Sequence, residues 1–171
     1  MRISGNYGTH LAPLIQCMGR THGDVLEMGM GYFSTPYLHY QCLLSERHLT
    51  SYDNDKGWVK RFSYSTFSNH KYQGRYHDLI YVKSFDDAKI EKPWDVALID
   101  HSPSERRIVD VRRLSDYAKY IVIHDSNDDR HGRKEYKYQE VYPLFKHRKV
   151  WDKEDRHATV LSNFESLEDL W

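Results

Sequence analysis

The sequence has few cysteines, no net charge and no long hydrophobic run. Cys17 and Cys42 are the two cysteines in 171 residues, too few for a disulfide scaffold, and both fit packing positions on helices. The 25 Lys and Arg residues balance the 25 Asp and Glu residues, so no overall field draws the chain to nucleic acid or to an anionic membrane. No apolar run approaches the ~20 residues of a membrane helix, and we expect no leader peptide and no membrane partner. These absences predict a soluble, cytoplasmic protein.

Tyrosine and histidine are plentiful instead, with 14 Tyr and 11 His. Tyrosine suits both a mixed core and a pocket for sugars or other polyols, because its ring is apolar and its tip is polar. The length fits one α/β domain over 1–171, with a sheet covered by helices on both faces. We predict an N-terminal helix at about 9–20, a core at about 24–162 and a short C-terminal tail.

The most informative segment runs from residue 24 to residue 36. Val25 and Leu26 suit a strand that is buried on both faces of a parallel sheet, and Glu27 follows them. Gly29 and Gly31 allow a tight turn and the close approach of a ligand to the main chain. This order of parts predicts a nucleotide-binding site at the carboxyl end of a strand.

The residues after this turn predict a helix and a second acidic position. We expect Ser34 or Thr35 to cap a helix at about 36–44, with Pro36 in its first turn. A second apolar stretch begins at residue 49 and ends at Asp53, where such folds place an acid for ribose hydroxyls.

Two further apolar stretches end in pairs of acid and histidine. Residues 94–100 end at Asp100, which His101 follows, and residues 120–125 end at His124 and Asp125. Because parallel strands have their carboxyl ends at one edge of a sheet, both pairs are expected to point into the same crevice.

These segments resemble the class I S-adenosylmethionine (SAM) dependent methyltransferases. Glu27, Gly29 and Gly31 match the first motif of that family, Asp53 matches the acid of the second strand, and residues 94–100 and 120–125 match the fourth and fifth strands. Phe33 stands where the family often has a third glycine. The resemblance implies a Rossmann-like fold with a mostly parallel seven-stranded sheet.

The resemblance also implies which residues contact the cofactor. They are the residues of the first motif and of the strand ends, namely Glu27, Gly29, Gly31, Ser34, Asp53, Ser84, Phe85 and Asp100. Phe85, which follows a predicted strand at 79–82, would stack on the adenine, although a core position fits it almost as well. The N-terminal helix would bring Tyr7 and His10 to the mouth of the cofactor site.

Methyl transfer requires alignment of donor and acceptor and removal of the acceptor's proton. We predict His101 or His124 as the base, with Asp100 and Asp125 as acceptor ligands or orienting groups. In an alternative implied by similar O-methyltransferases, Asp100 and Asp125 hold Mg²⁺ together with Asn127 or Asp128.

Other predicted elements flank this crevice. We expect a helix at about 57–67, a helix at 104–117, a lid or acceptor-binding loop at 125–137, a helix at 140–145, and strands at 148–153 and 158–162.

The sequence favours methylation of a hydroxyl on a sugar, a glycan or another polar small molecule. The segment after the fourth strand, Asp100-His101-Ser102-Pro103, differs from the motif of similar enzymes that methylate amino groups. A homodimer is compatible with this assignment.

Three alternatives stay open. An RNA or DNA methyltransferase would use the arginines of 106–113 with Arg130, Arg133 and Lys134 as a phosphate track, although a solvated helix face explains those arginines more simply. An NAD-dependent oxidoreductase is a competitor because Gly29, Gly31 and Ser34 nearly match a dinucleotide motif, but Glu27 would repel a pyrophosphate. A non-catalytic protein could bind SAM with the same pocket.

Overall fold

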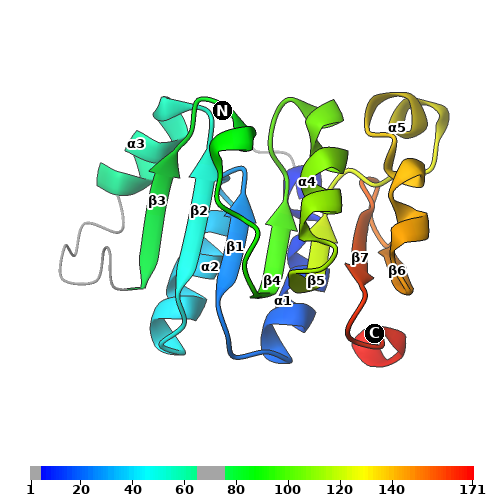
Figure 1. Cartoon of the computed structure of the whole chain (residues 1–171), viewed down its shortest axis with the longest axis horizontal. Helices are drawn as coiled ribbons and strands as arrows, with labels where there is room; N and C mark the ends of the chain where they lie inside the picture. Colours follow the sequence, from blue (N-terminus) through cyan, green and yellow to red (C-terminus); the bar gives the residue numbers. More distant parts are fainter. Residues whose placement is uncertain (1–4, 65–75) are drawn as a thin grey trace.

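Seven strands form one sheet in the computed structural model, which describes residues 5–64 and 76–171 (Figure 1). Their order is β3-β2-β1-β4-β5-β7-β6, and β7 runs antiparallel to both of its neighbours while β1 to β5 pair in parallel. The strands are β1 Val25–Met28, β2 Leu49–Asp53, β3 His77–Tyr81, β4 Trp94–Ile99, β5 Ala118–Ile123, β6 His147–Trp151 and β7 Ala158–Ser162. The predicted α/β fold with a mostly parallel seven-stranded sheet is therefore confirmed.

Helices cover both faces of the sheet because its central strands are apolar on both sides. In β1, Val25 packs toward α1 (Leu11–Gly19) and α2 (Ser34–Leu44), and Leu26 packs toward α4 (Arg107–Leu114) on the opposite face. In β4, Leu98 and Ile99 divide in the same way. α3 (Lys56–Tyr64) packs on Leu79 of β3.

Several predicted elements are confirmed and others shift. The helix at 9–20, the helix at 36–44 and the strand at 158–162 correspond to α1, α2 and β7. The helix at 104–117 is shorter, with a 3-10 turn at Ser104–Arg106 before α4. The end of the helix predicted at 57–67 lies outside the described residues.

Two predictions of local structure are wrong. Phe33 is the N-cap of α2, without a side-chain cap, because the hydroxyl of Thr35 instead accepts the Gly31 N–H and donates to Glu27. The segment 140–145 is not an α-helix. It lies in two 3-10 turns, Tyr138–Glu140 and Tyr142–Leu144, because Pro143 has no N–H to continue a helical ladder.

The segment that follows β5 contains one more short helix. α5 (Arg130–Glu135) begins after Asp129, whose side chain caps it by accepting the Gly132 N–H. Further 3-10 turns are Gly5–Gly8, Phe85–Asp87 and Glu168–Leu170. Among the helices of residues 5–64 and 76–171, none combines the length and apolar character that a membrane crossing requires.

The order of the strands fixes where a ligand can bind. β1 pairs with β2 on one side and with β4 on the other. Strands β1 to β3 therefore extend across the sheet in one direction, and β4 and β5 extend in the other. Crevices in open α/β sheets form outside the carboxyl ends of the strands at such a switch point. The glycine turn, Asp100 and His124 all follow strands at this edge.

Candidate active site

The two glycines after β1 have different roles. Gly29 has a φ of +95°, and an added Cβ would lie 2.5 Å from the carbonyl oxygen of Asp100, so this position requires glycine. At Gly31 an added Cβ would lie 3.7 Å from Ser34 Oγ, an ordinary van der Waals contact. Gly29 therefore joins the turn to the end of β4, and Gly31 leaves space over the turn.

Glu27 lies underneath the turn rather than beside the crevice. Its side chain is fully buried, and its two oxygens accept hydrogen bonds from Thr35 (2.9 Å) and Ser51 (2.6 Å). Burial raises the pKa of Glu27 to about 7, although the hydroxyls of Ser34, Ser51 and Thr35 act against this shift. Glu27 and Ser34 thus support the turn, and their contact with a cofactor stays a prediction.

Asp53 ties the end of β2 to the same turn. Its Oδ2 accepts the N–H of Met30 at 2.7 Å, and its Oδ1 accepts the N–H of Asp55 at 2.7 Å. Burial raises its pKa above the usual value despite these backbone bonds. Because each carboxylate oxygen can accept more than one hydrogen bond, Asp53 retains capacity for a ribose hydroxyl.

The two residues predicted to contact the adenine, Phe85 and Ser84, already have partners within the protein. Phe85 is buried, and its ring stacks on that of His101 with 4.0 Å between the centroids. Ser84 accepts the N–H of Asp86 and donates to the carboxylate of the same residue. The structure therefore gives Phe85 the core position that the sequence left open, and adenine stacking on it stays a prediction.

His101 turns away from Asp100, toward α4. Its Nε2 lies 3.1 Å from a carboxylate oxygen of Asp110, which is itself fully buried. Burial lowers the pKa of His101, and Asp110 only partly offsets this effect. Of the two histidines predicted as the base, the geometry therefore favours His124.

His124 forms a close cluster with Asp100 and His10. Its Nδ1 lies 3.2 Å from Asp100 Oδ2, and its Nε2 lies 2.9 Å from the hydroxyl of Thr9. His10 Nδ1 lies 3.7 Å from the same Asp100 oxygen, and its ring meets that of His124 edge-on at 4.7 Å. The start of α1 thus brings His10 to the carboxyl edge of the sheet, and the place of His10 and Tyr7 at the mouth of a cofactor site stays a prediction.

A buried arginine pairs with the carboxylates of Asp100 and Asp125. Arg107, at the start of α4, lies 2.9 Å from Asp100 and 3.4 Å from Asp125. Burial alone would raise the pKa of Asp100, but the charge of Arg107 and the contact with His124 hold it far below its usual range. Asp100 is therefore an anion at neutral pH.

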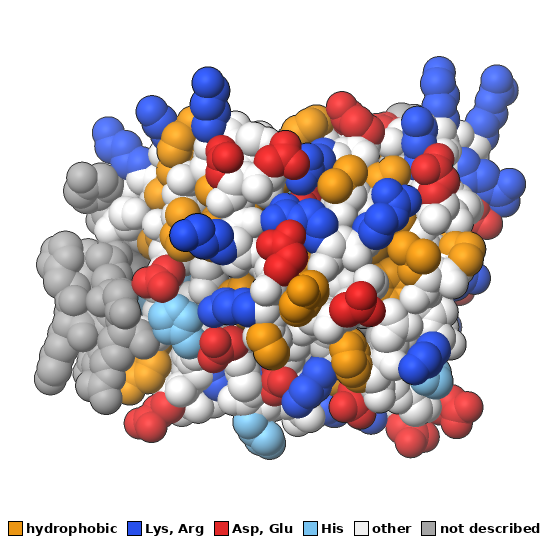
Figure 2. Space-filling view, in the orientation of Figure 1, with side chains coloured by type: hydrophobic (Ala, Val, Ile, Leu, Met, Phe, Trp, Pro, Cys, Tyr) orange, Lys and Arg blue, Asp and Glu red, His pale blue; other side chains and the backbone are white. Residues whose placement is uncertain are grey.

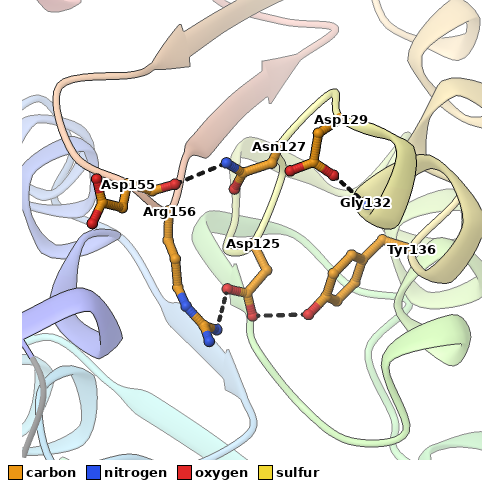
Figure 3. A pocket seen from close by; sticks show the side chains of 7 residues that line it. All are labelled: Asp125, Asn127, Asp129, Gly132, Tyr136, Asp155 and Arg156. Atoms are coloured by element: carbon orange, nitrogen blue, oxygen red, sulfur yellow. Dashed lines mark hydrogen bonds and ion pairs between the residues drawn. The ribbon is translucent and has the colours of Figure 1, made fainter.

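A polar pocket of ≈ 200 Å³ opens beside Asp125 (Figure 3). Asp125 lies between Arg156, whose Nη1 is 2.7 Å away, and Tyr136, whose hydroxyl donates at 3.2 Å. Burial and the Asp125 charge raise the pKa of Tyr136 to about 12, so its hydroxyl stays a donor. The lining residues are Asp125, Asn127, Asp129, Gly132, Tyr136, Asp155 and Arg156.

Three of the four oxygen ligands predicted for Mg²⁺ are engaged elsewhere. Asn127 donates to the Asp155 carbonyl and accepts the His157 N–H, and Asp128 pairs with Arg133 on the surface. Asp125 pairs with Arg107 and Arg156. Within the part of the chain that the structure describes, the group placed to hold an ion is His10, Asp100 and His124, each of which offers one ligand atom within 4.8 Å of the others.

Most arginines of the predicted phosphate track already have partners. Arg106 pairs with Asp86 and Asp110, and Arg113 pairs with Glu91 and Asp110. The interpretation of these residues as one solvated face is wrong for Arg107, which is buried. Its spacing to Val111 and Leu114 is the signal that could have shown this, because i, i+4 and i+7 form one helical stripe. Tyr136 falls within the segment 125–137 that the sequence predicts as a lid or acceptor-binding loop, whereas the sequence position of Arg156 carries no comparable signal.

Comparison with solved structures places this geometry among known proteins. The cofactor-bound protein Rv0187 from MTB matches with a TM-score of 0.66 at 15% identity, over 96% of this chain and 83% of that one. A proposed O-methyltransferase from Klebsiella pneumoniae matches at 0.62 and 16%, over 95% and 82%. Human methyltransferase-like protein 13 in complex with SAH matches at 0.59 and 12%, over 94% and 81%.

The chain has the class I methyltransferase fold. No family model and no curated protein sequence matches it. The methyltransferase fold explains the positions of the glycine turn and of Asp53, Asp100 and Asp125, because all lie at or just after the carboxyl ends of strands. At these identities the similarity shows the fold, and the chemistry must be argued from the site.

Proposed function

We propose that this protein transfers a methyl group from SAM to a hydroxyl group of a polar small molecule, such as a sugar. One observation carries the proposal: a continuous series of contacts joins the glycine turn to the polar pocket. Gly29 packs on Asp100, Asp100 pairs with Arg107, and Arg107 pairs with Asp125 at the pocket wall. The place for a nucleotide and the place for a polar acceptor are therefore adjacent.

The residues around the glycine turn fit the cofactor. The space over Gly31 admits a ligand close to the backbone, and Asp53 can accept hydrogen bonds from ribose hydroxyls. The ionised Asp100 places a negative charge at the same edge, where a cationic donor gains favourable electrostatic energy. When bound, SAM would supply a methyl group on a sulfonium. The thioether that leaves needs no further activation.

The pocket residues select a polar acceptor. Tyr136 can donate a hydrogen bond, Arg156 carries a positive charge, and Asp125 and Asp129 can accept hydrogen bonds. A polyol offers both donors and acceptors on neighbouring carbons, so it can satisfy such a lining. An apolar acceptor would leave these groups without partners, which costs about 1–3 kcal/mol for each.

The Asp100–His124 pair is assigned to the acceptor's proton. Asp100 is the more exposed member, at 21% of its side chain against 2% for His124, so it is the group that an acceptor hydroxyl can reach. His124 lies directly behind it and can share a proton with the carboxylate. The chain therefore orients the acceptor through Asp100 and stores the proton at the pair.

An RNA acceptor is the second candidate. Lys and Arg side chains project along the upper edge in Figure 2, over α3 and α5. The exposed basic residues of these helices are Lys56, Lys60, Arg61, Arg130, Arg133 and Lys134. Such binding would weaken steeply with salt, because it depends on phosphate charge.

Calorimetry with SAM, S-adenosylhomocysteine and NAD tests the cofactor directly. We expect SAM and S-adenosylhomocysteine to bind and NAD not to bind. Gly31→Val should abolish binding in a folded protein, because the new side chain fills the space over the turn. Gly19→Val is the matched control, since a Cβ there has nothing within 4 Å. Equal SAM binding by wild type and Gly31→Val, or binding of NAD instead of SAM, would refute the proposal.

An acceptor screen then separates the remaining alternatives. Transfer of the methyl group to a sugar, with a rate that changes little between low and high salt, supports the polar-pocket assignment. Transfer to RNA with steep salt dependence would replace it. SAM binding without transfer to any acceptor class would indicate a non-catalytic SAM-binding protein.

A further inference from the structure

We propose that His10, Asp100 and His124 bind a divalent transition-metal ion of the zinc class. The inference deepens the proposed function, on which it rests for the role of the ion but not for its binding. The three residues come from α1's N-terminal end, the end of β4 and the end of β5, so the fold itself brings them together. Asp100 is the central member, since both histidines face its Oδ2.

The spacing of the ligand atoms suits an ion. Asp100 Oδ2 lies 3.2 Å from Nδ1 of His124 and 3.7 Å from Nδ1 of His10. Zinc bonds of about 2.0–2.2 Å in tetrahedral geometry separate two ligand atoms by roughly 3.3–3.6 Å. The ligand atoms of the two histidines lie within 4.8 Å of each other, so an inward movement of these side chains would bring all three residues to one ion.

His10 is the observation that points to a missing partner. Its side chain is 2% exposed, and neither Nδ1 nor Nε2 has a hydrogen-bond partner. A buried polar group without a partner costs about 1–3 kcal/mol, so it is rare unless something else occupies the site. An ion beside Asp100 would give Nδ1 of His10 a bond.

The neighbouring residues hold the ligands in the required orientation. The Thr9 hydroxyl lies 2.9 Å from Nε2 of His124, which leaves Nδ1 directed at Asp100. Arg107 binds Oδ1 of Asp100 at 2.9 Å and leaves Oδ2 to face the histidines. Outer partners of this kind orient the ligands of metal sites. Where Nε2 donates to Thr9, Nδ1 and Oδ2 are two acceptors facing each other, and a cation between them satisfies both.

The donor set also indicates the class of ion. Two imidazole nitrogens and one carboxylate oxygen suit Zn²⁺, Co²⁺ or Fe²⁺, whereas Mg²⁺ prefers oxygen ligands. Three protein ligands leave one position open, as in catalytic rather than structural sites. The bound ion would then place its positive charge where, in the metal-free protein, the Asp100–His124 pair holds the acceptor's proton.

Titration of the metal-free 171-residue chain tests the inference without any activity measurement. Co²⁺ is the spectroscopic probe, because its visible absorption reports tetrahedral coordination, and Zn²⁺ is measured by displacement of Co²⁺. We expect one ion per chain, binding of Zn²⁺ tighter than that of Mg²⁺, and loss of roughly 100-fold or more in affinity in His10→Ala. Asp100→Asn, which conserves shape, should lose a similar factor. Circular dichroism establishes that each variant is folded.

His22→Ala is the matched control, because His22 is an exposed histidine that lies outside the cluster. It should bind Co²⁺ like the wild type. The inference is overturned if the wild type takes up no Co²⁺, if His10→Ala binds as tightly as the wild type, or if His22→Ala loses as much affinity as His10→Ala. SAM calorimetry on the same metal-free samples separates the two proposals, since a chain that binds SAM but no metal refutes only this one.

Discussion

Two buried polar clusters, one under the glycine turn and one around Asp100, differ in how completely their members are bonded. Under the glycine turn, both oxygens of Glu27 accept hydrogen bonds from hydroxyls, and Ser51 continues the chain of contacts to His77 at 2.9 Å. Around Asp100, by contrast, His10 has two nitrogens without hydrogen-bond partners.

The difference separates a cluster that shapes the fold from one that is open to a ligand. A fully bonded buried network fixes one conformation, and its loss is felt as lost stability. Groups left without partners reduce stability, and natural chains retain them mainly at functional sites. We therefore expect substitutions in the cluster under the turn to change stability, and substitutions in the Asp100 cluster to change ligand binding.

The largest expected effect is at Gly29, where the turn meets Asp100. Gly29→Ala should destabilise the protein by about 3 kcal/mol or more, since it combines an unfavourable φ with a backbone clash. Urea unfolding measures this change. Gly19→Ala, at the end of α1, should be neutral or stabilising by up to about 1 kcal/mol. A Gly29→Ala variant as stable as wild type would mean that the two clusters are not rigidly joined.

Glu27→Gln gives the next largest effect and depends on pH. The pKa of Glu27 is raised from 4.5 to about 7, so the folded chain keeps a proton that the unfolded chain releases. The stability that this group contributes is present below about pH 4.5 and is lost as pH rises through 7, amounting to about 3 kcal/mol at most. Relative to the wild type, the variant should therefore gain about 1–3 kcal/mol of stability between pH 5 and pH 8.

Urea unfolding at pH 5 and pH 8 checks this prediction. Buried His10 and His77, whose pKa values are lowered to about 4 and about 3, shift stability in the opposite direction between about pH 3 and 6.5. The difference between variant and wild type isolates Glu27. Glu140→Gln, on an exposed residue, should change stability by less than about 0.5 kcal/mol at both values. No change in the pH slope for Glu27→Gln would place Glu27 in contact with solvent or a ligand instead.

The sequence predicts the fold well because the strands are defined by local pattern. Apolar runs such as 94–99 and 158–162 need no partner to be recognised, and acids at their ends mark the edge of the sheet. The segment 140–145 looked helical by the same criterion. Its turns are set by Pro143 and by Tyr138, which is buried and donates from its hydroxyl to the His124 carbonyl.

The candidate site was predicted less completely because its contacts join distant segments. His10 and Asp100 are 90 residues apart, and Arg156 reaches Asp125 from the loop between β6 and β7. The sequence placed Asp53, Asp100 and Asp125 at the carboxyl ends of strands, but it could not show that Asp125 would pair with arginines or that Glu27 would lie underneath the turn. It also could not show that His101 would face Asp110, because that contact depends on how α4 lies on the sheet.

Arg156→Met tests the pocket side of the Asp100 cluster. The pair with Asp125 is partly exposed, since 40% of the Arg156 side chain is accessible, so stability should fall by less than about 1 kcal/mol. The KM for the acceptor should rise by about 10-fold, the value of one charge-assisted hydrogen bond, while SAM affinity stays unchanged. Lys153→Met removes another exposed cation from the same loop and should alter neither quantity. Equal KM values for the two variants would exclude Arg156 from acceptor binding.

The smallest effect is expected from the triple variant Arg112→Ala, Arg130→Ala and Lys134→Ala. All three side chains are exposed, so stability should change by less than about 0.5 kcal/mol. Methyl transfer to a small polar acceptor should stay within about twofold of wild type at any salt concentration, because a neutral acceptor gains little from distant, screened charges. A large loss of activity that disappears at high salt would instead show that the acceptor carries phosphates and extends across α5, since neutralising each phosphate contact makes binding more dependent on salt.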